Sequence, residues 1–246
     1  MALPGIYDMF AQKWDGQTVW IYSDSHFSDV DLECGIKNRP SDDEQIRRIN
    51  AKCGRKDTLI ILGDVGNIDC VRRLRAAHKV LIMGNHDAGA TNYKREIKKI
   101  KFDKKEYSKE EVRAIVMTDY PGWRINIDEG YDFHSPFEYW IVEVDNCLFD
   151  EVYEGALIIG EKLILSHEPI MGLTWVMNLH GHVHDKRAKT DAYHINCCSD
   201  VIGYEPINFN QFLKAGHMSK IQTIHRETID KATDRKKKRG GKKIGR

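Results

Sequence analysis

The sequence predicts an α/β fold built around a parallel sheet, and two observations carry this prediction. First, short runs of β-branched and aliphatic residues recur along the first hundred residues, and each run stops abruptly at polar residues and glycines. Second, segments of helical character separate these runs, and strand–helix–strand alternation implies parallel neighbours joined by right-handed crossovers. The length of 246 residues suits one sizeable domain with its own core.

Three strands are predicted in the first hundred residues, and they span residues 18–22, 58–62 and 79–83. The polar residues that follow them include Asp24 and His26, then Asp64, and then Asn85 and His86. Because the carboxyl ends of parallel strands form the ligand-binding edge of such a sheet, we expect these side chains to lie close together.

Helices are predicted between and after these strands. Ser41 and Glu44 have the spacing of a capping box at the start of the first helix. The second helix is predicted over residues 68–78. Residues 91–118 are rich in Lys and Glu and are predicted to be helical, with Ser108 as a cap.

From residue 122 to residue 166 the pattern changes to short strands separated by turns, which predicts an antiparallel meander that forms a second sheet. Its strands are expected at 139–144, 156–159 and 163–165. Two more units follow in which polar residues come at a strand end. The first includes His167, and the second includes His182 and His184.

The charge distribution separates a body from a tail. Residues 214–246 carry 12 Lys or Arg and 3 Asp or Glu, against 26 and 34 in residues 1–213. We therefore expect one domain over 1–215 and a basic, disordered tail over 216–246. The tail could contact nucleic acid or act as a targeting signal, but the acidic body would repel a polyanion, which favours a solvated tail.

The sequence also predicts a cytoplasmic protein. No run approaches the roughly 20 apolar residues of a membrane span, and the N-terminus lacks the basic and apolar regions of a signal peptide. The six cysteines show no CxxC spacing, so we expect reduced thiols. The adjacent pair Cys197 and Cys198 could be redox-active, but ordinary packing is the favoured interpretation.

The polar clusters offer carboxylate, imidazole and amide groups, which suit a borderline divalent metal. The candidate metal ligands are Asp24, His26, Asp64, Asn85, His167, His182 and His184. Residues two apart at an extended strand end point the same way, so each Asp-x-His or His-x-His pair can reach one ion. Each residue alone could be a cap, a turn or a surface residue, and the ordered set of seven predicts a metal site.

The ordered motifs DxH, GDxG, GNHD, a strand-end His and GHxH resemble those of the calcineurin-like metallophosphoesterase superfamily. The resemblance runs from about Thr18 to Phe212, and residues 196–207 are similar to a strand and loop of small bacterial and phage-type members. It implies a two-sheet β-sandwich flanked by helices. It further implies one metal bound by Asp24, His26 and His184, another bound by Asn85, His167 and His182, and Asp64 as the bridge between them.

The implied chemistry is attack by a metal-bridging hydroxide on a phosphate ester, with charge cancelled by the two ions. His86, beside the site, is the candidate general acid, and Asp87 or Asp24 could orient it. Asp64 and His86 are thus the predicted catalytic residues. Mn²⁺ is the expected metal, and a ligand set of nitrogen and oxygen also permits Fe, Zn²⁺ or Ni²⁺.

The motifs depart from those of the Ser/Thr protein phosphatases, which have a Gly after the first His, GDxxDRG and GNHE. Here Phe27 replaces the Gly after the first His, Asn67 replaces the second Asp of GDxxDRG, and Asp87 replaces the Glu of GNHE. The arginine that would bind a phosphate after Asp64 is missing. The sequence therefore predicts hydrolysis of phosphomonoesters or phosphodiesters by an enzyme of another branch. The alternatives are a nuclease and a non-catalytic protein-binding scaffold, and the complete ligand set favours an enzyme.

Overall fold

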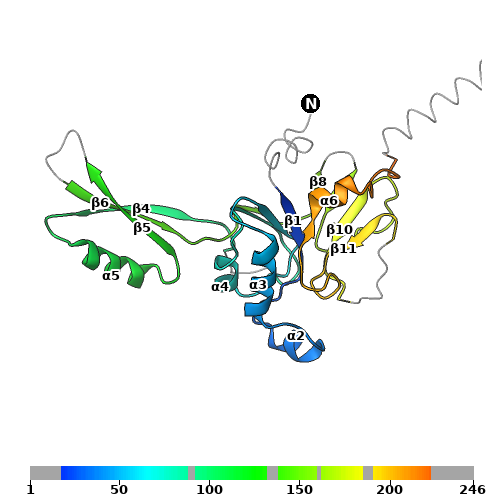
Figure 1. Ribbon diagram of the computed structural model, residues 1–246, viewed down its shortest axis with the longest axis horizontal. Coiled ribbons are helices and arrows are strands. Elements are labelled where there is room, and N and C mark those ends of the chain that lie inside the picture. Colours follow the sequence, from blue (N-terminus) through cyan, green and yellow to red (C-terminus); the bar gives the residue numbers. More distant parts are fainter. Residues whose placement is uncertain (1–17, 88–91, 132–137, 160–161, 185–190, 223–246) are drawn as a thin grey trace, which may run out of the picture.

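The computed structural model describes residues 18–87, 92–131, 138–159, 162–184 and 191–222. Its body consists of two sheets packed face to face, with helices on the outside (Figure 1). The mixed α/β class and the sandwich with flanking helices, both predicted from the sequence, are confirmed. In the part of the chain that is described, no helix is long and apolar enough to cross a membrane.

The first sheet has the strand order β12-β1-β2-β3-β7. Its strands are β12 (Ile207–Asn208), β1 (Val19–Tyr22), β2 (Thr58–Ile61), β3 (His78–Ile82) and β7 (Glu151–Tyr153). All neighbours are parallel except β12, which pairs antiparallel with β1. The central strands are apolar along their whole length because both faces of this sheet are covered.

The second sheet has the order β11-β10-β9-β8. Its strands are β11 (His194–Asn196), β10 (Met177–His180), β9 (Leu163–Leu165) and β8 (Leu157–Ile159), and only β8 is antiparallel to its neighbour. The inner faces of the two sheets share one core, in which Ile60 and Val80 pack with Leu165 and Leu179. Helix α6 (Phe209–Lys214) adds Phe209 and Phe212 to this core.

The outer face of the first sheet packs against α3 (Asp42–Lys52) and α4 (Ile68–Arg72). A short helix, α2 (Val30–Gly35), follows the first strand. Helix α4 is shorter than predicted, because residues 73–77 are irregular and His78 already belongs to β3.

A third sheet, of order β4-β6-β5, and one helix extend to one side of the body, and we call this unit the arm (Figure 1). It comprises β4 (Ile97–Asp103), α5 (Lys109–Asp119), β5 (Arg124–Tyr131) and β6 (Glu138–Asp145). The arm has a separate core, in which Val112 and Val116 of α5 pack on Val142 and Val144 of β6.

The predicted helix over residues 91–118 is wrong in its first half, where the chain forms β4. The Lys-rich composition favoured a helix, but Ile100 and Phe102 alternate with lysines and pair with Val142 and Trp140 of β6. Cross-strand packing therefore outweighs the intrinsic preference of the segment. The second half is helical, and Ser108 forms the expected capping box with Glu111.

The predicted meander is divided among all three sheets. Its first strand belongs to β6 in the arm, whereas the strands at 156–159 and 163–165 correspond to β8 and β9 of the second sheet. Between them, β7 joins the first sheet beside β3. The predicted basic tail lies outside the described residues from position 223 onward, so the division into domain and tail stays a prediction.

Candidate metal centre

The seven predicted ligands lie at the carboxyl ends of five strands. Asp24 follows β1, Asp64 follows β2 and Asn85 follows β3 in the first sheet, while His167 follows β9 and the pair His182 and His184 follows β10 in the second. The second ligand of the first pair, His26, lies two residues beyond Asp24. The same edge of the sandwich thus brings all seven together, and their role as ligands stays a prediction.

One cluster contains Asp64, Asn85, His167 and His182. The Nε2 atom of His167 lies 3.2 Å from Asp64 Oδ2, 2.9 Å from Asn85 Oδ1 and 3.1 Å from His182 Nδ1. The Nδ1 atom of His167 lies 2.8 Å from the carbonyl oxygen of Leu62, which can only accept a proton. Nδ1 therefore donates, and Nε2 faces other electron-rich atoms, an arrangement that either a proton on Nε2 or a metal cation between these atoms satisfies.

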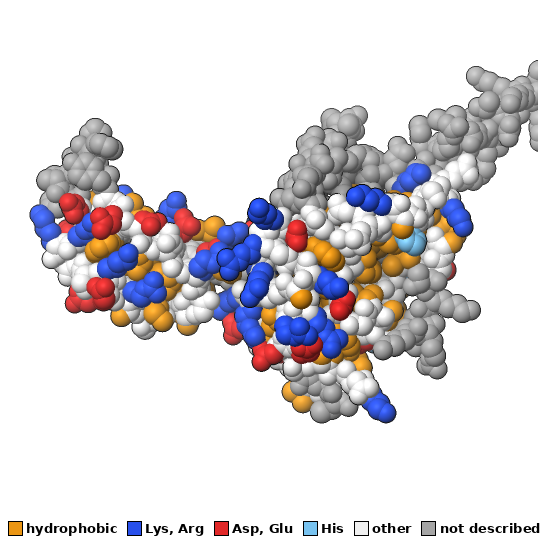
Figure 2. All heavy atoms as spheres, viewed as in Figure 1, with side chains coloured by type: hydrophobic (Ala, Val, Ile, Leu, Met, Phe, Trp, Pro, Cys, Tyr) orange, Lys and Arg blue, Asp and Glu red, His pale blue; other side chains and the backbone are white. Residues whose placement is uncertain are grey.

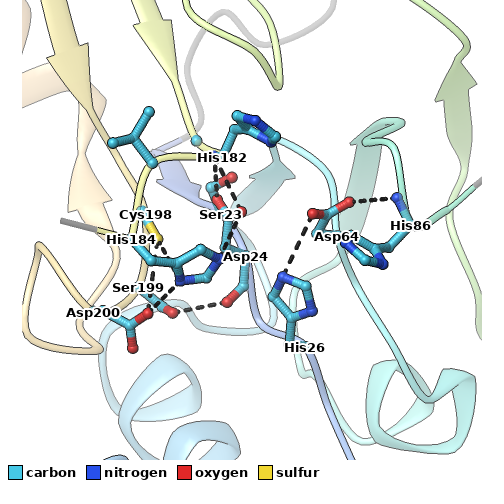
Figure 3. A network of polar contacts seen from close by, with 12 residues as sticks. Ser23, Asp24, His26, Asp64, His86, His182, His184, Cys198, Ser199 and Asp200 are labelled. Carbon is cyan, nitrogen blue, oxygen red and sulfur yellow. Dashed lines mark hydrogen bonds and ion pairs between the residues drawn. The ribbon is translucent and has the colours of Figure 1, made fainter. Parts of the chain in front are cut away.

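The second cluster contains Asp24, His26 and His184, with Asp64 at its side. His26 Nε2 lies 3.4 Å from Asp64 Oδ2, and His184 Nε2 lies 3.5 Å from Asp24 Oδ1. Figure 3 shows His26 directed at Asp64 and His184 at Asp24. His26 Nε2 is buried and has no hydrogen-bond partner among the described residues. Such an orphaned nitrogen fits a metal ligand, because its lone pair would otherwise be buried unsatisfied.

Asp64 connects the two clusters, because its Oδ2 atom faces both His26 and His167. Its other oxygen accepts the backbone N–H of His86 at 2.9 Å. Burial would raise the pKa of Asp64, but the neighbouring imidazoles of His167 and His26 and the backbone N–H of His86 outweigh it and hold this pKa below its ordinary value. The carboxylate is therefore ionised and placed between two sets of donors, which is the position that a bridging ligand needs.

The charges favour cations at this edge. Asp24 is 0% exposed, and burial raises its pKa. Burial by itself would lower the pKa of His167, yet the hydrogen bond to Asp64 and the charge of Asp24 raise it to about 9. In the absence of a metal a proton is held where the carboxylates converge, and a divalent ion would replace it.

The backbone at four of the candidate ligands has an unfavourable conformation that directs their side chains into the centre. Asp24, His26, Asp64 and His182 all have positive φ, between 39° and 65°. Non-glycine residues avoid this region, and each costs on the order of 1 kcal/mol. Four such residues within one site are a sign of function, since the conformation turns their side chains toward the same point.

Asp200 contacts the Nδ1 atom of His184, and Arg39 binds Asp200. Neither residue was predicted from the sequence. His184 Nδ1 lies 2.5 Å from Asp200 Oδ2 (Figure 3). Arg39 Nη1 donates to Asp200 Oδ1 at 3.1 Å. The hydroxyl of Tyr204 also donates to Asp200. Asp200 lies within the segment 196–207 that resembles the family, but nothing in the sequence connects it with His184.

The same region contains Cys198, which sequence reasoning placed in ordinary packing. Its Sγ atom lies 3.4 Å from His184 Nδ1, and Asp24, His184 and Cys198 form one of the groups that could hold a metal. Burial raises the pKa of this thiol well above its usual range. The thiol is therefore protonated while no metal is bound. Cys197 and Cys198 are both fully buried, in agreement with a packing role.

His86 lies at the rim of the centre, exposed, with its ring 5.3 Å from that of His26 between centroids. Among the described residues, no hydrogen bond joins its ring to Asp87 or Asp24. The carboxylate of Asp87 instead accepts the backbone N–H groups of Gly84, Asp64 and Val65. Asp87 therefore shapes the loops that present the ligands.

Replacing Asp200 with Asn is expected to weaken metal binding by about 10- to 100-fold, because the carboxylate fixes the ring of His184 and increases its basicity. A competition titration with a chromophoric chelator measures the metal Kd. The matched control is Asp191→Asn, which alters a similar pair outside the centre, with Asp191 Oδ1 3.0 Å from His194 Nδ1. Equal metal affinity in the two variants would contradict the role of Asp200.

Comparison with known proteins agrees with the geometry. The family model described as calcineurin-like phosphoesterase matches residues 17–186. No curated protein matches the sequence. Among solved structures, the chain is similar to a protein of unknown function from Aquifex aeolicus, with 19% identity and a TM-score of 0.48 over 81% of this chain and 99% of the other. The family model spans more than half of the sequence, and the protein therefore belongs to the calcineurin-like phosphoesterases, a family of metal-dependent hydrolases.

Proposed function

We propose that this protein hydrolyses small phosphoesters with two divalent metal ions. Asp24, His26 and His184 would hold one ion, Asn85, His167 and His182 would hold the other, and Asp64 would be shared. The observation that carries the proposal is the position of Asp64 Oδ2, 3.4 Å from the unpartnered His26 Nε2 and 3.2 Å from His167 Nε2.

The chemistry that two such ions supply is ionisation of a water near neutral pH and cancellation of charge on the phosphoryl oxygens. Nitrogen and oxygen donors support Mn²⁺ as the first choice, with Fe, Zn²⁺ and Ni²⁺ as alternatives. The protein's contribution is to hold these donor atoms in position. The hydrogen bonds of His167 to Leu62, of His26 to Asp29 and of His184 to Asp200 hold three of the rings in place.

His86 has the position of a general acid. Its backbone N–H is anchored to Asp64, and its exposed ring stands beside His26 at the mouth of the centre. An imidazolium there would give its proton to the leaving oxygen of the substrate. Among the described residues, the ring belongs to none of the groups of His, Cys and carboxylate side chains that could hold a metal, which supports a role in proton transfer rather than in metal binding.

Replacing His86 with Ala should leave the metal content unchanged and reduce kcat/KM on alkyl phosphoesters by about 10²- to 10⁴-fold, the usual contribution of a general acid. The loss on nitrophenyl esters should be much smaller, since nitrophenolate leaves without a proton. Steady-state rates on both ester types test this, with the exposed His217 replaced by Ala as a control. Equal losses on the two types would remove the general-acid role.

The cavity next to the centre favours small substrates over nucleic acid. It has a volume of about 360 Å³ and reaches Asn85 and His167. Glu154 and Glu168 line it, both exposed, and none of its described lining residues is Lys or Arg. Arg39, which binds Asp200 beside the centre, has a fully buried side chain. Two carboxylates at the mouth would repel a polynucleotide, so a phosphoester with a neutral or cationic leaving group fits best.

Metal analysis of the purified protein together with three substrates tests this function. We expect two divalent ions per chain and hydrolysis of nitrophenyl phosphate or bis-nitrophenyl phosphate, with slower turnover of single-stranded DNA. The ratio of the two nitrophenyl rates assigns the enzyme as a monoesterase or a diesterase. Faster cleavage of DNA would favour a nuclease, and bound metal without any hydrolysis would favour a protein-binding scaffold.

A further inference from the structure

A cavity of about 480 Å³ lies where the arm joins the body, and its lining is strongly basic. Seven of its lining residues are Lys or Arg, and two are Asp. Figure 2 shows Lys and Arg side chains gathered at this junction. The concentration of positive charge contrasts with residues 1–213 as a whole, which carry 26 basic and 34 acidic residues.

This cavity lies at the opposite edge of the first sheet from the metal centre. Arg55 and Arg75 precede β2 and β3, whereas Asp64 and Asn85 follow the same two strands. β3 has five residues, so roughly 16 Å of strand separates the two edges. The basic cavity is therefore a separate site, and nothing in the proposed hydrolysis uses it.

Two of its guanidinium groups have no acidic partner. Arg55 and Arg75 are exposed, and no carboxylate of the described chain lies within salt-bridge distance of either. The two acidic lining residues are already engaged, because Arg95 binds Asp145 at 2.6 Å and Asp150 at 2.7 Å. Arg55 and Arg75 are thus left to bind an anion from solution.

The buried side of the cavity adds two cations, Lys79 and Arg72, and the second of these is paired with Asp69 through its Nη1 atom at 2.8 Å. Lys79 is 5% exposed, and its Nζ atom donates to the carbonyl oxygens of Val71 and Cys147. Burial lowers the pKa of Lys79 to about 8, and an anion nearby would favour its charged form. The Nε atom of Arg72 is also buried, with no hydrogen-bond partner in the described part of the chain.

We propose that this cavity binds a small oligophosphate, an anion with two or more linked phosphate groups. Guanidinium groups bind phosphate through paired, charge-assisted hydrogen bonds, and the volume falls within the range of about 300–1,000 Å³ found for small-ligand sites. A nucleic-acid strand fits less well, since the lining residues Arg73 and Arg72 are paired with Asp43 and Asp69, which are 80% and 71% exposed and would repel a longer polyanion.

Calorimetric titration of the full-length protein with inorganic tripolyphosphate, in excess Mg²⁺, tests the proposal. The double variant Arg55→Ser/Arg75→Ser removes the two unpaired charges and should raise the Kd by about tenfold or more. The matched control is Lys56→Ser/Lys214→Ser, which removes two exposed charges that do not line the cavity and should leave the Kd within about twofold. Equal effects of the two double variants would overturn the proposal, as would the absence of binding below about 1 mM.

Two further experiments locate the binding site and identify the class of ligand. Asp64→Asn, which alters the metal centre, should not weaken tripolyphosphate binding at the cavity. If Asp64→Asn loses tripolyphosphate binding and the double arginine variant keeps it, the anion binds at the metal centre. This result would contradict the proposed binding site in the cavity and would leave the proposed hydrolysis intact. Tighter binding of a single-stranded oligonucleotide than of tripolyphosphate, again lost with the two arginines, would replace the small oligophosphate by nucleic acid.

Discussion

Replacing Asp64 with Asn should reduce kcat/KM for phosphoester hydrolysis by about a thousandfold or more, since bridged metal ions contribute several kcal/mol to the transition state. Its Oδ2 atom faces both His26 and His167. An amide is neutral and cannot place a negative charge between two cations, so at least one ion should be lost. Metal analysis and steady-state rates measure both effects.

The control for this variant is Asp31→Asn, which alters an exposed carboxylate on α2. It should retain the metal content and the activity of the unaltered protein. An Asp64→Asn protein that keeps two ions and most of its activity would show that Asp64 does not bridge, and the assignment of the two clusters to one dinuclear centre would then be wrong.

Replacing Gly181 with Ala should reduce activity by about a hundredfold or more, because displacing catalytic groups by about 1 Å has this effect. A Cβ atom at this position would lie 1.9 Å from Ser23 Oγ and 2.2 Å from Asp24 Oδ2. Neither neighbour has free space to move into, since both are 0% exposed and Ser23 Oγ donates to the carbonyl of Leu62 at 2.6 Å, so relief of the clash must shift the surrounding structure. The shift would move Asp24 and the backbone N–H of His182 that binds it.

Gly35→Ala is the matched control, because a Cβ atom there meets nothing within 4 Å. Thermal unfolding and steady-state rates of the two variants separate a local effect from a general one. We expect Gly181→Ala to lower the Tm as well as the rate, while Gly35→Ala changes neither. Full activity in Gly181→Ala would mean that Ser23 and Asp24 tolerate displacement, and the close packing around Asp24 would then be unnecessary for catalysis.

The candidate site could be predicted from the sequence because its residues follow a local rule. Asp24, Asp64 and Asn85 each come directly after a short apolar strand, and parallel pairing then brings these strand ends to one edge. The same rule applies to His167 and His182 in the second sheet. Each step depends on a few consecutive residues, so the pattern is visible without knowledge of the tertiary structure.

The features that could not be predicted depend on distant contacts. The β4 strand is rich in Lys and becomes a strand only because β6, some forty residues later, pairs with it. Asp200 reaches His184 through a turn after β11, and Arg39 reaches Asp200 from the loop before α3. Neither contact has a periodicity or a motif that would indicate it.

The way in which the arm is attached determines how a change in its length affects the rest of the protein. Glu96 and Asn146 stand next to each other at its base, with Asn146 N 3.1 Å from Glu96 O and Glu96 N 3.0 Å from Asn146 Oδ1. The chain leaves the body and returns to it side by side at this point, where Arg95 also binds Asp145, so residues 97–145 form a closed excursion between β3 and β7. A change in the length of the excursion would leave the strands of the sandwich in place, so the arm can vary without displacing the candidate metal ligands.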